Sequence, residues 1–212
     1  MQLIDSVEAR VLGALIEKEA TTPEYYPLSL NALVNACNQK SNREPVVDYD
    51  SDTVHDAVER LRDKKLALTV VGSGRVTKYA QRISETVNLG RRELAVLCTL
   101  LLRGPQTLGE IKDRSERMFA FGDPSETESV LDKLAEWAGQ SLVAKLPRQP
   151  GRKEARYTHL LSGEPKMESF SESAPTAAHP TRIAQLEQEI QRLRSDLDQL
   201  RQRFDDLEAQ LR

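Results

Sequence analysis

The chain has 212 residues, which leaves room for two small domains or for one domain with a substantial tail. Its 39% of hydrophobic residues are enough to fill modest cores, and the length argues against a single large enzyme fold. Its 30 basic and 33 acidic residues give a formal net charge of -3, which excludes a bulk positive field that would attract nucleic acid or a membrane surface. Any role with nucleic acid must therefore depend on local patches of charge.

Three amphipathic helices are predicted in the first third of the chain. In residues 5–19, Val7, Val11 and Leu15 recur at helical spacing, and Asp5 or Ser6 can cap the first turn. A second helical pattern follows at about 29–38, after a loop that contains prolines. A third follows at about 51–64, after a polar turn. Because each pattern has one apolar face, we expect the three helices to share a core.

A short hairpin is predicted to follow these helices. Residues 66–71 and 76–80 are rich in Val and Thr, and Gly72 and Gly74 between them permit a tight turn. Three helices followed by a two-stranded ribbon is the order of a winged helix, in which the ribbon covers a flank of the helical core. This fold accounts for residues 3 to about 82.

The same order recurs in the next part of the chain. Residues 8–15 (EARVLGAL) match residues 93–100 (ELAVLCTL), and Ser29-Leu30 matches Thr107-Leu108. A second ribbon is predicted from residues 142–146 and 155–161. The sequence thus predicts a mainly α protein with small β wings, formed by two tandem winged-helix (helix-turn-helix) domains, residues 1–87 and 88–162, each burying its apolar side chains in its own core.

The remaining residues predict a linker and a C-terminal coiled-coil helix. Residues 163–180 are rich in Ser, Glu, Pro and Ala, a composition that favours a flexible linker. Residues 181–212 carry a heptad repeat with an unbroken apolar seam. The predicted dimerisation residues are Ile183, Leu186, Ile190, Leu193, Leu197, Leu200, Phe204, Leu207 and Leu211.

Flanking charges predict that this coiled coil is a parallel homodimer. In a parallel pair, Arg182 would face Glu187, Glu189 would face Arg194, and two further facing pairs would also attract. In a centred antiparallel pair, like charges would oppose one another. Phe204 fits a two-stranded seam poorly, and the alternative is a single amphipathic helix that folds back onto its own domains.

The cellular compartment is indicated by what the sequence lacks. No basic start followed by an apolar run opens the chain, and the longest nearly apolar run, residues 94–102, is far too short to span a membrane. Cys37 and Cys98 lie in apolar helical patterns without metal-ligand spacing, which predicts buried free thiols in a reducing compartment. We therefore expect a cytoplasmic protein without membrane contact.

No catalytic motif is visible in the sequence. It contains no phosphate-binding loop, paired-histidine metal motif or nucleophile elbow, and His55, His159 and His179 lie in unrelated contexts. We therefore expect a protein that is not an enzyme and that needs no cofactor or metal. Convergence of scattered residues in the fold is the remaining route to catalysis.

Conventional reading of DNA bases by the third helix of each domain is disfavoured by charge. The outward positions of these helices carry carboxylates, which phosphates repel. They are Asp52, Asp56, Glu59 and Asp63 in the first domain and Glu126, Glu128, Asp132 and Glu136 in the second.

Cations in the wings and in the turn before the first of these helices are the alternative contacts for phosphate. The candidate nucleic-acid-binding residues are Lys40, Asn42, Arg43, Arg75, Lys78, Arg152, Lys153 and Arg156. The competing interpretation of the cations is a solvated surface that balances nearby acids. For residues 38–43 it is a helix stop whose side chains cap the backbone.

Aromatic residues could in principle stack on bases. We instead expect Tyr25, Tyr26, Phe119, Phe121 and Trp137 to fill cores or anchor loops.

Five segments closely resemble the YceH-type proteins of bacteria. They are residues 21–31 (TTPEYYPLSLN), 36–46 (ACNQKSNREPV), 75–79 (RVTKY), 100–107 (LLLRGPQT) and 156–160 (RYTHL). The resemblance covers about residues 3–163, and the heptad tail resembles family members only in kind. It implies a bacterial cytosolic protein with tandem winged helices, and it brings no activity, ligand or functional residue to carry over.

Two functions are open at this stage. The first is a non-catalytic, dimeric DNA-binding protein, such as a transcriptional regulator, that contacts nucleic acid through basic wings and turns. The second is a protein-assembly module that docks its acidic helix faces on another protein and binds no nucleic acid.

Overall fold

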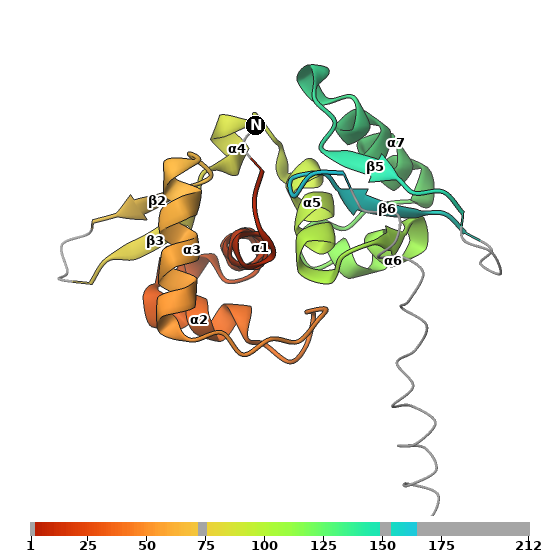
Figure 1. Ribbon diagram of the computed structural model, residues 1–212. Coiled ribbons are helices and arrows are strands. Elements are labelled where there is room, and N and C mark those ends of the chain that lie inside the picture. Colours follow the sequence, from red (N-terminus) through yellow and green to blue (C-terminus); the bar gives the residue numbers. More distant parts are fainter. Residues whose placement is uncertain (1–2, 72–75, 149–153, 165–212) are drawn as a thin grey trace, which may run out of the picture. The chain divides into compact units, whose positions relative to one another are not determined.

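The structure is a computed structural model that describes residues 3–71, 76–148 and 154–164 (Figure 1). These residues are mainly helical and contain two small antiparallel sheets of three strands each. The predicted coiled coil, all of its seam residues and most of the predicted linker lie outside the described residues. None of the described helices combines the length and apolar content that crossing a bilayer would require.

The first repeat contains helices close to the positions that the sequence predicts. Its sheet has the strand order β1-β3-β2, and Thr69 of β2 pairs with Tyr79 of β3. Its elements are α1 (Ser6–Thr21), a 3-10 turn (Pro23–Tyr25), β1 (Leu28–Ser29), α2 (Leu30–Cys37), α3 (Ser51–Asp63), β2 (Ala67–Val70), β3 (Lys78–Gln81) and the short α4 (Ile83–Thr86).

The second repeat has the same order of main elements. Its sheet has the equivalent strand order, β4-β6-β5. Its elements are α5 (Arg91–Arg103), β4 (Gln106–Thr107), α6 (Leu108–Ser115), α7 (Pro124–Ala135), a 3-10 turn (Trp137–Gly139), β5 (Val143–Lys145) and β6 (Arg156–His159). The internal repeat in the sequence is therefore also a repeat of secondary structure.

Polar side chains at equivalent positions begin the helices of the two repeats. Ser29 and Thr107 are the N-cap residues of α2 and α6, and each hydroxyl accepts a hydrogen bond from the backbone N–H three residues later. Asp50 and Asp123 cap α3 and α7 in the same way. Asp5 caps α1, as its position predicts. These caps explain why the helix starts are readable from the sequence.

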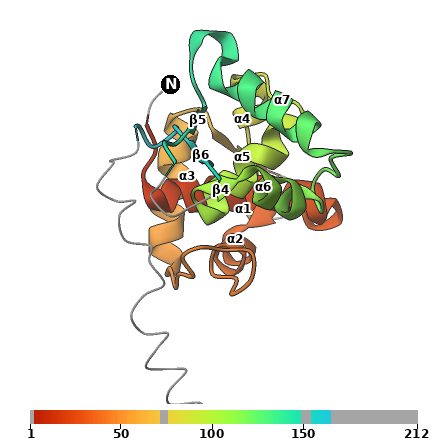
Figure 2. The same cartoon turned by 90° about the vertical axis from the view of Figure 1, so that its right-hand side faces the viewer.

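The two repeats share one core, so the expectation of a separate core in each is wrong. Every residue of α1 from Glu8 to Glu17 is buried, because the helix packs on α2 and α3 with one face and on α5 with another. Figure 1 shows α1 between α3 and α5, and the quarter-turn view in Figure 2 shows it between α2 and α5. The buried apolar residues form a continuous cluster within the compact unit Met1–Pro165. The predicted boundary at residues 87/88 stays a prediction.

Hydrogen bonds to backbone carbonyls also connect the two repeats. The Ile4 N–H donates to the carbonyl of Leu161 at 2.9 Å, and the Glu44 N–H donates to the carbonyl of Leu102 at 2.9 Å. The indole N–H of Trp137 donates to the carbonyl of Val87 at 2.8 Å. The shared core is thus accompanied by hydrogen bonds at several separate points.

Candidate functional site

The outward face of α3 is acidic, as the sequence predicts. Val54, Val58 and Leu61 are fully buried and fix which side of the helix faces the core. On the opposite side, the carboxylates of Asp52, Asp56 and Asp63 are exposed. Glu59 is half-buried and forms an ion pair with Arg62.

The outward face of α7 is acidic in the same way. Leu131 and Leu134 are buried, while Glu128, Asp132 and Glu136 are exposed. Glu126 is half-buried, and one of its carboxylate oxygens lies 3.2 Å from Nη1 of Arg92. We refer to the exposed carboxylates of the two helices together as the acidic faces; they are Asp52, Asp56, Asp63, Glu128, Asp132 and Glu136.

Two of the predicted nucleic-acid-binding residues have exposed side chains. Lys40 follows α2, and Lys78 is the first residue of β3. The second hairpin carries exposed Lys145 and Arg148 close to its turn. Arg75, Arg152 and Lys153 lie outside the described residues, so their predicted role stays a prediction.

Arg156 is held by contacts within its own repeat. It is half-buried, its Nη1 atom lies 3.2 Å from a carboxylate oxygen of Glu110, and the same group donates to the carbonyl of Pro105 at 2.7 Å. Through these contacts, one end of the Arg156 guanidinium holds β6 against α6 and against Pro105, the residue before β4. Phosphate would have to compete with Glu110 for it.

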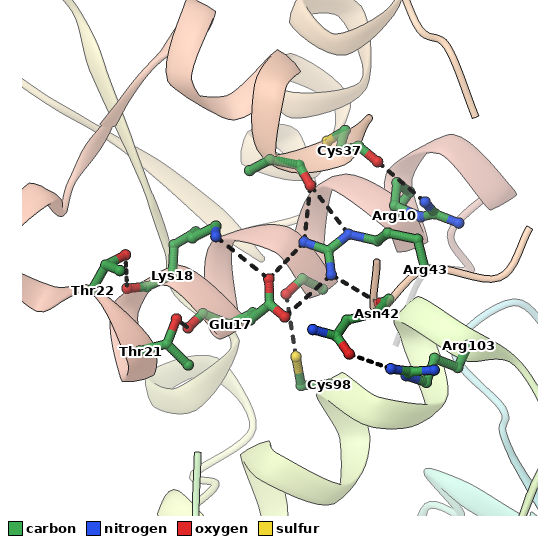
Figure 3. Close-up of polar contacts among 12 residues, drawn as sticks. Arg10, Glu17, Lys18, Thr21, Thr22, Cys37, Asn42, Arg43, Cys98 and Arg103 are labelled. Carbon is green, nitrogen blue, oxygen red and sulfur yellow. Dashed lines mark hydrogen bonds and ion pairs between the residues drawn. The ribbon is translucent and has the colours of Figure 1, made fainter. Parts of the chain in front are cut away.

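Arg43 is a correction to the sequence analysis, because its side chain has no exposed surface. Its Nη1 and Nη2 atoms donate to the two carboxylate oxygens of Glu17 at 3.2 and 2.6 Å. Its Nε and Nη2 atoms also donate to the carbonyl of Ala36 at 3.1 and 2.9 Å (Figure 3). The Arg43 guanidinium is therefore a buried structural cation with no exposed surface to offer to phosphate.

Asn42 and its neighbours likewise serve the fold. Asn42 has a left-handed backbone conformation with φ 59°, and its side-chain oxygen accepts a hydrogen bond from Arg103 of α5 (Figure 3). The Asn38 side chain bonds to both the N–H and the carbonyl of Tyr49 at 2.8 Å. The described contacts thus favour the helix-stop interpretation of residues 38–43.

Two buried charged residues inside α1, Arg10 and Glu17, were not anticipated from the sequence. Arg10 donates to the carbonyls of Cys37 at 3.1 Å and Pro45 at 2.5 Å, and burial, followed by repulsion from Arg43, lowers its pKa. Glu17 lies two turns further along the helix. The available signal was the presence of charged residues within a stretch that is apolar on more than one face. Such residues need buried partners.

Both cysteines are free and buried, as predicted. Burial raises the pKa of the Cys37 thiol to about 12 and raises that of Cys98 as well. The Cys98 thiol donates to the carbonyl of Gly13 at 3.3 Å. Burial thus keeps both thiols protonated at neutral pH, and protonated thiols are poor nucleophiles. Within the described residues, no cluster of His, Cys, Asp and Glu side chains could hold a metal ion.

Most of the aromatic side chains pack or anchor loops, as expected. The Tyr26 hydroxyl accepts a hydrogen bond from the Gln81 N–H at 2.6 Å, and burial raises its pKa. Phe119 and Phe121 stack edge to face with centroids 4.9 Å apart. Tyr25 differs, because it is 73% exposed.

Comparison with known proteins identifies close relatives over most of the chain. The family model described as "Protein of unknown function, DUF480" matches residues 4–152. A "UPF0502 protein" of Solibacter usitatus is 53% identical over 207 residues, which are 95% of this chain and 98% of the relative. Relatives of the same name are 55% identical in Citrifermentans bemidjiense, covering 88% of each chain, and 44% identical in Aeromonas hydrophila, covering 98% and 99%. None of these names states a ligand, a substrate or a partner.

Proposed function

The chain belongs to the DUF480 family of proteins of unknown function, and from its own geometry we propose that it is a non-catalytic assembly module of two tandem winged helices that binds a basic surface of another protein. The single observation that carries this proposal is the pair of acidic faces on α3 and α7. The winged-helix interpretation itself rests on the repeated order of helices and strands. The β2–β3 and β5–β6 hairpins would be the wings.

Charge complementarity explains why the partner should be basic. In each repeat the third helix is held by its buried apolar side, so its carboxylates lie on a rigid support. Carboxylates on a rigid face attract lysine and arginine side chains and reject phosphates. Meanwhile, three of the eight residues that the sequence nominated for nucleic acid, Asn42, Arg43 and Arg156, are engaged within the protein.

Dimerisation would strengthen such an interaction. We propose that residues 181–212 form the parallel coiled coil that their heptads predict, so that two copies carry four acidic helix faces. Linked copies bind a repeated partner surface with an avidity above that of one copy. The free thiols of Cys37 and Cys98 support placing this assembly in the reducing cytoplasm.

A second candidate function is DNA binding through the wings. It is favoured by the exposure of Lys78, Lys145 and Arg148 on the two hairpins. Arg75, Arg152 and Lys153 would add to this charge. In this alternative, the phosphate backbone would be clamped without reading of bases by α3 or α7.

The two candidates are separated by charge variants of the full chain. The acidic-face variant is Asp56→Asn/Asp63→Asn/Glu128→Gln/Asp132→Asn. A matched control neutralises the same number of exposed acids elsewhere, as Glu24→Gln/Glu44→Gln/Glu85→Gln/Glu116→Gln. The wing variant is Arg75→Ala/Lys78→Ala/Arg152→Ala/Lys153→Ala.

Two measurements are made on each protein: cross-linked capture of partners from native cell extract, and a gel shift with random duplex DNA at two salt concentrations. The assembly proposal expects partners that the acidic-face variant loses and the other two variants retain. DNA binding would instead give a shift that weakens steeply with salt, with a shallower dependence in the wing variant. Partners captured equally by all the variants would refute the role of the acidic faces.

A further inference from the structure

An apolar groove lies at the surface where α1 crosses α5. It has a volume of about 400 Å³ and is lined mainly by Ile16, Ala20, Pro23, Leu94, Ala95 and Met118. Glu19 and Arg91 are the charged residues at its margin. A groove of this volume with mainly apolar walls is large enough to hold the apolar body of a small molecule.

A smaller hollow, with several charged residues in its lining, continues the groove along the same two helices. It has a volume of about 30 Å³, enough for about two water-sized groups, and it is lined by Arg103, Arg114, Arg117 and Asn42. Met118 lines both spaces. On α5, Thr99 of the hollow follows Ala95 of the groove by one helical turn. The groove and the hollow are therefore neighbours along one line.

The hollow carries an excess of positive charge. Glu17, which also lines it, is neutralised by its two hydrogen bonds from Arg43. Among the residues that the structure describes, Arg103 is bonded to the neutral amide of Asn42, and neither Arg103 nor Arg117 forms an ion pair. Burial, followed by repulsion from Arg114, lowers the pKa of Arg103. The lining of the hollow thus contains three arginines, Arg103, Arg114 and Arg117, and one carboxylate, that of Glu17.

The ends of the helices account for only part of this cluster. Arg103 and Arg114 lie in the last turns of α5 and α6, where a cation is favoured by the helix dipole. Arg114 also lies 3.6 Å from one carboxylate oxygen of Glu110, and Arg156 contacts the other oxygen of the same carboxylate. The helix dipole does not explain why both residues line the same hollow with Arg117, beside an open apolar groove.

We propose that the groove and the hollow form one binding site for a small anionic amphiphile. Its apolar body would lie between α1 and α5, and its carboxylate or phosphate head group would lie against the arginines. Guanidinium groups suit both head groups, because they can donate two parallel hydrogen bonds to a pair of oxygen atoms. The site uses no residue of the acidic faces, so it adds a ligand to the proposed assembly function and does not depend on it.

The test is calorimetric titration of the full chain with four probes: decanoate, decyl phosphate, decanol and inorganic phosphate, each below its aggregation concentration. We expect decanoate or decyl phosphate to bind about tenfold more tightly than decanol, because one charge-assisted hydrogen bond is worth about that factor. The tighter of the two anionic probes identifies the preferred head group. Inorganic phosphate should bind more weakly than either, because it lacks the apolar body.

Two variants at exposed positions assign the binding to this site. Arg117→Gln should weaken the anionic probes about tenfold and leave decanol unchanged. Ala20→Leu should fill the groove and weaken both the anionic probes and decanol. Arg82→Gln, at an exposed arginine of the segment before α4, is the matched control and should change nothing.

Three results would each overturn the proposal. The first is the absence of saturable binding by both decanoate and decyl phosphate. The second is binding of decanol as tight as that of the anionic probes. The third is anionic binding that is the same in wild type, Arg117→Gln and Ala20→Leu, because the ligand would then lie elsewhere. A circular dichroism spectrum of each variant verifies that it is folded.

Discussion

Gly13 in α1 lies directly against Leu102 in α5. A Cβ atom added at Gly13 would be 2.8 Å from Cδ2 and 2.9 Å from Cγ of Leu102, and 3.2 Å from Cβ of Leu101. Carbon atoms do not approach one another this closely without a shift of one group. The close crossing of the two repeats therefore depends on the absence of a side chain at Gly13.

Gly13→Ala should destabilise the protein although alanine is the better helix former. We expect a loss of about 1 to 3 kcal/mol in the free energy of unfolding, because the added methyl group must displace the buried Leu102 side chain. Urea unfolding measures the change. The matched control is Gly109→Ala in α6, where no atom lies within 4 Å of the added Cβ, and it should stabilise by up to about 1 kcal/mol. Equal stability of Gly13→Ala and wild type would contradict the tight crossing.

Loss of Arg43 should be costly, because Glu17 would remain buried without its partner. We expect Arg43→Met to lower the free energy of unfolding by about 3 to 5 kcal/mol. The double variant Glu17→Leu/Arg43→Met should lose less than Arg43→Met alone, since neither charge of this buried pair is left without its partner. Arg62→Met, which removes the surface pair with the half-buried Glu59, is the control and should cost about 1 kcal/mol or less. A double variant that is less stable than Arg43→Met would argue against this account.

His159 should make the protein less stable in mild acid. Burial lowers the pKa of its imidazole to about 4, from an ordinary value of 6.5, and its Nδ1 atom has no hydrogen-bond partner within the described residues. As the pH falls, the unfolded chain binds this proton first. The contribution to stability is therefore complete above pH 6.5 and is lost progressively towards pH 4.

The measurement is the difference in unfolding free energy between pH 7 and pH 4.5, compared with a variant that cannot titrate. His159→Gln should lose less stability over this range than wild type, by at most about 3 kcal/mol. His55→Gln, which changes an exposed histidine, is the control variant and is measured at the same two pH values. If His159→Gln had the same pH profile as wild type, the imidazole would not be the responsible group.

Deletion of residues 181–212 should convert a dimer into a folded monomer. The heptad seam and its facing charges carry this prediction, and the core cluster described above is formed by residues of the unit Met1–Pro165. Sedimentation of the full chain and the shortened chain gives the two masses. A shortened chain that still sediments as a dimer would show that another surface joins the two copies.

Local features of the fold were predictable from the sequence, because each depends on residues that are near one another in the chain. The helix positions follow from apolar residues at helical spacing, and the N-caps follow from Ser29, Asp50 and Thr107 immediately before or at the start of those patterns. The acidic faces follow from the same spacing, because burial of Val58 and Leu61 turns the intervening carboxylates outward. The recurrence of the same elements in the second repeat was predictable for the same reason, because residues 93–100 carry the apolar pattern of residues 8–15.

The tertiary structure decided which buried faces meet and which charges pair. Helical spacing shows that a side of α1 is buried, but it does not state what covers that side, and here α5 completes one common core. Arg43 could be taken for a surface cation because its partner, Glu17, is 26 residues away in the chain. Pairing over such a separation depends on how the whole chain packs, so only the three-dimensional arrangement distinguishes a buried structural cation from one that could meet a ligand.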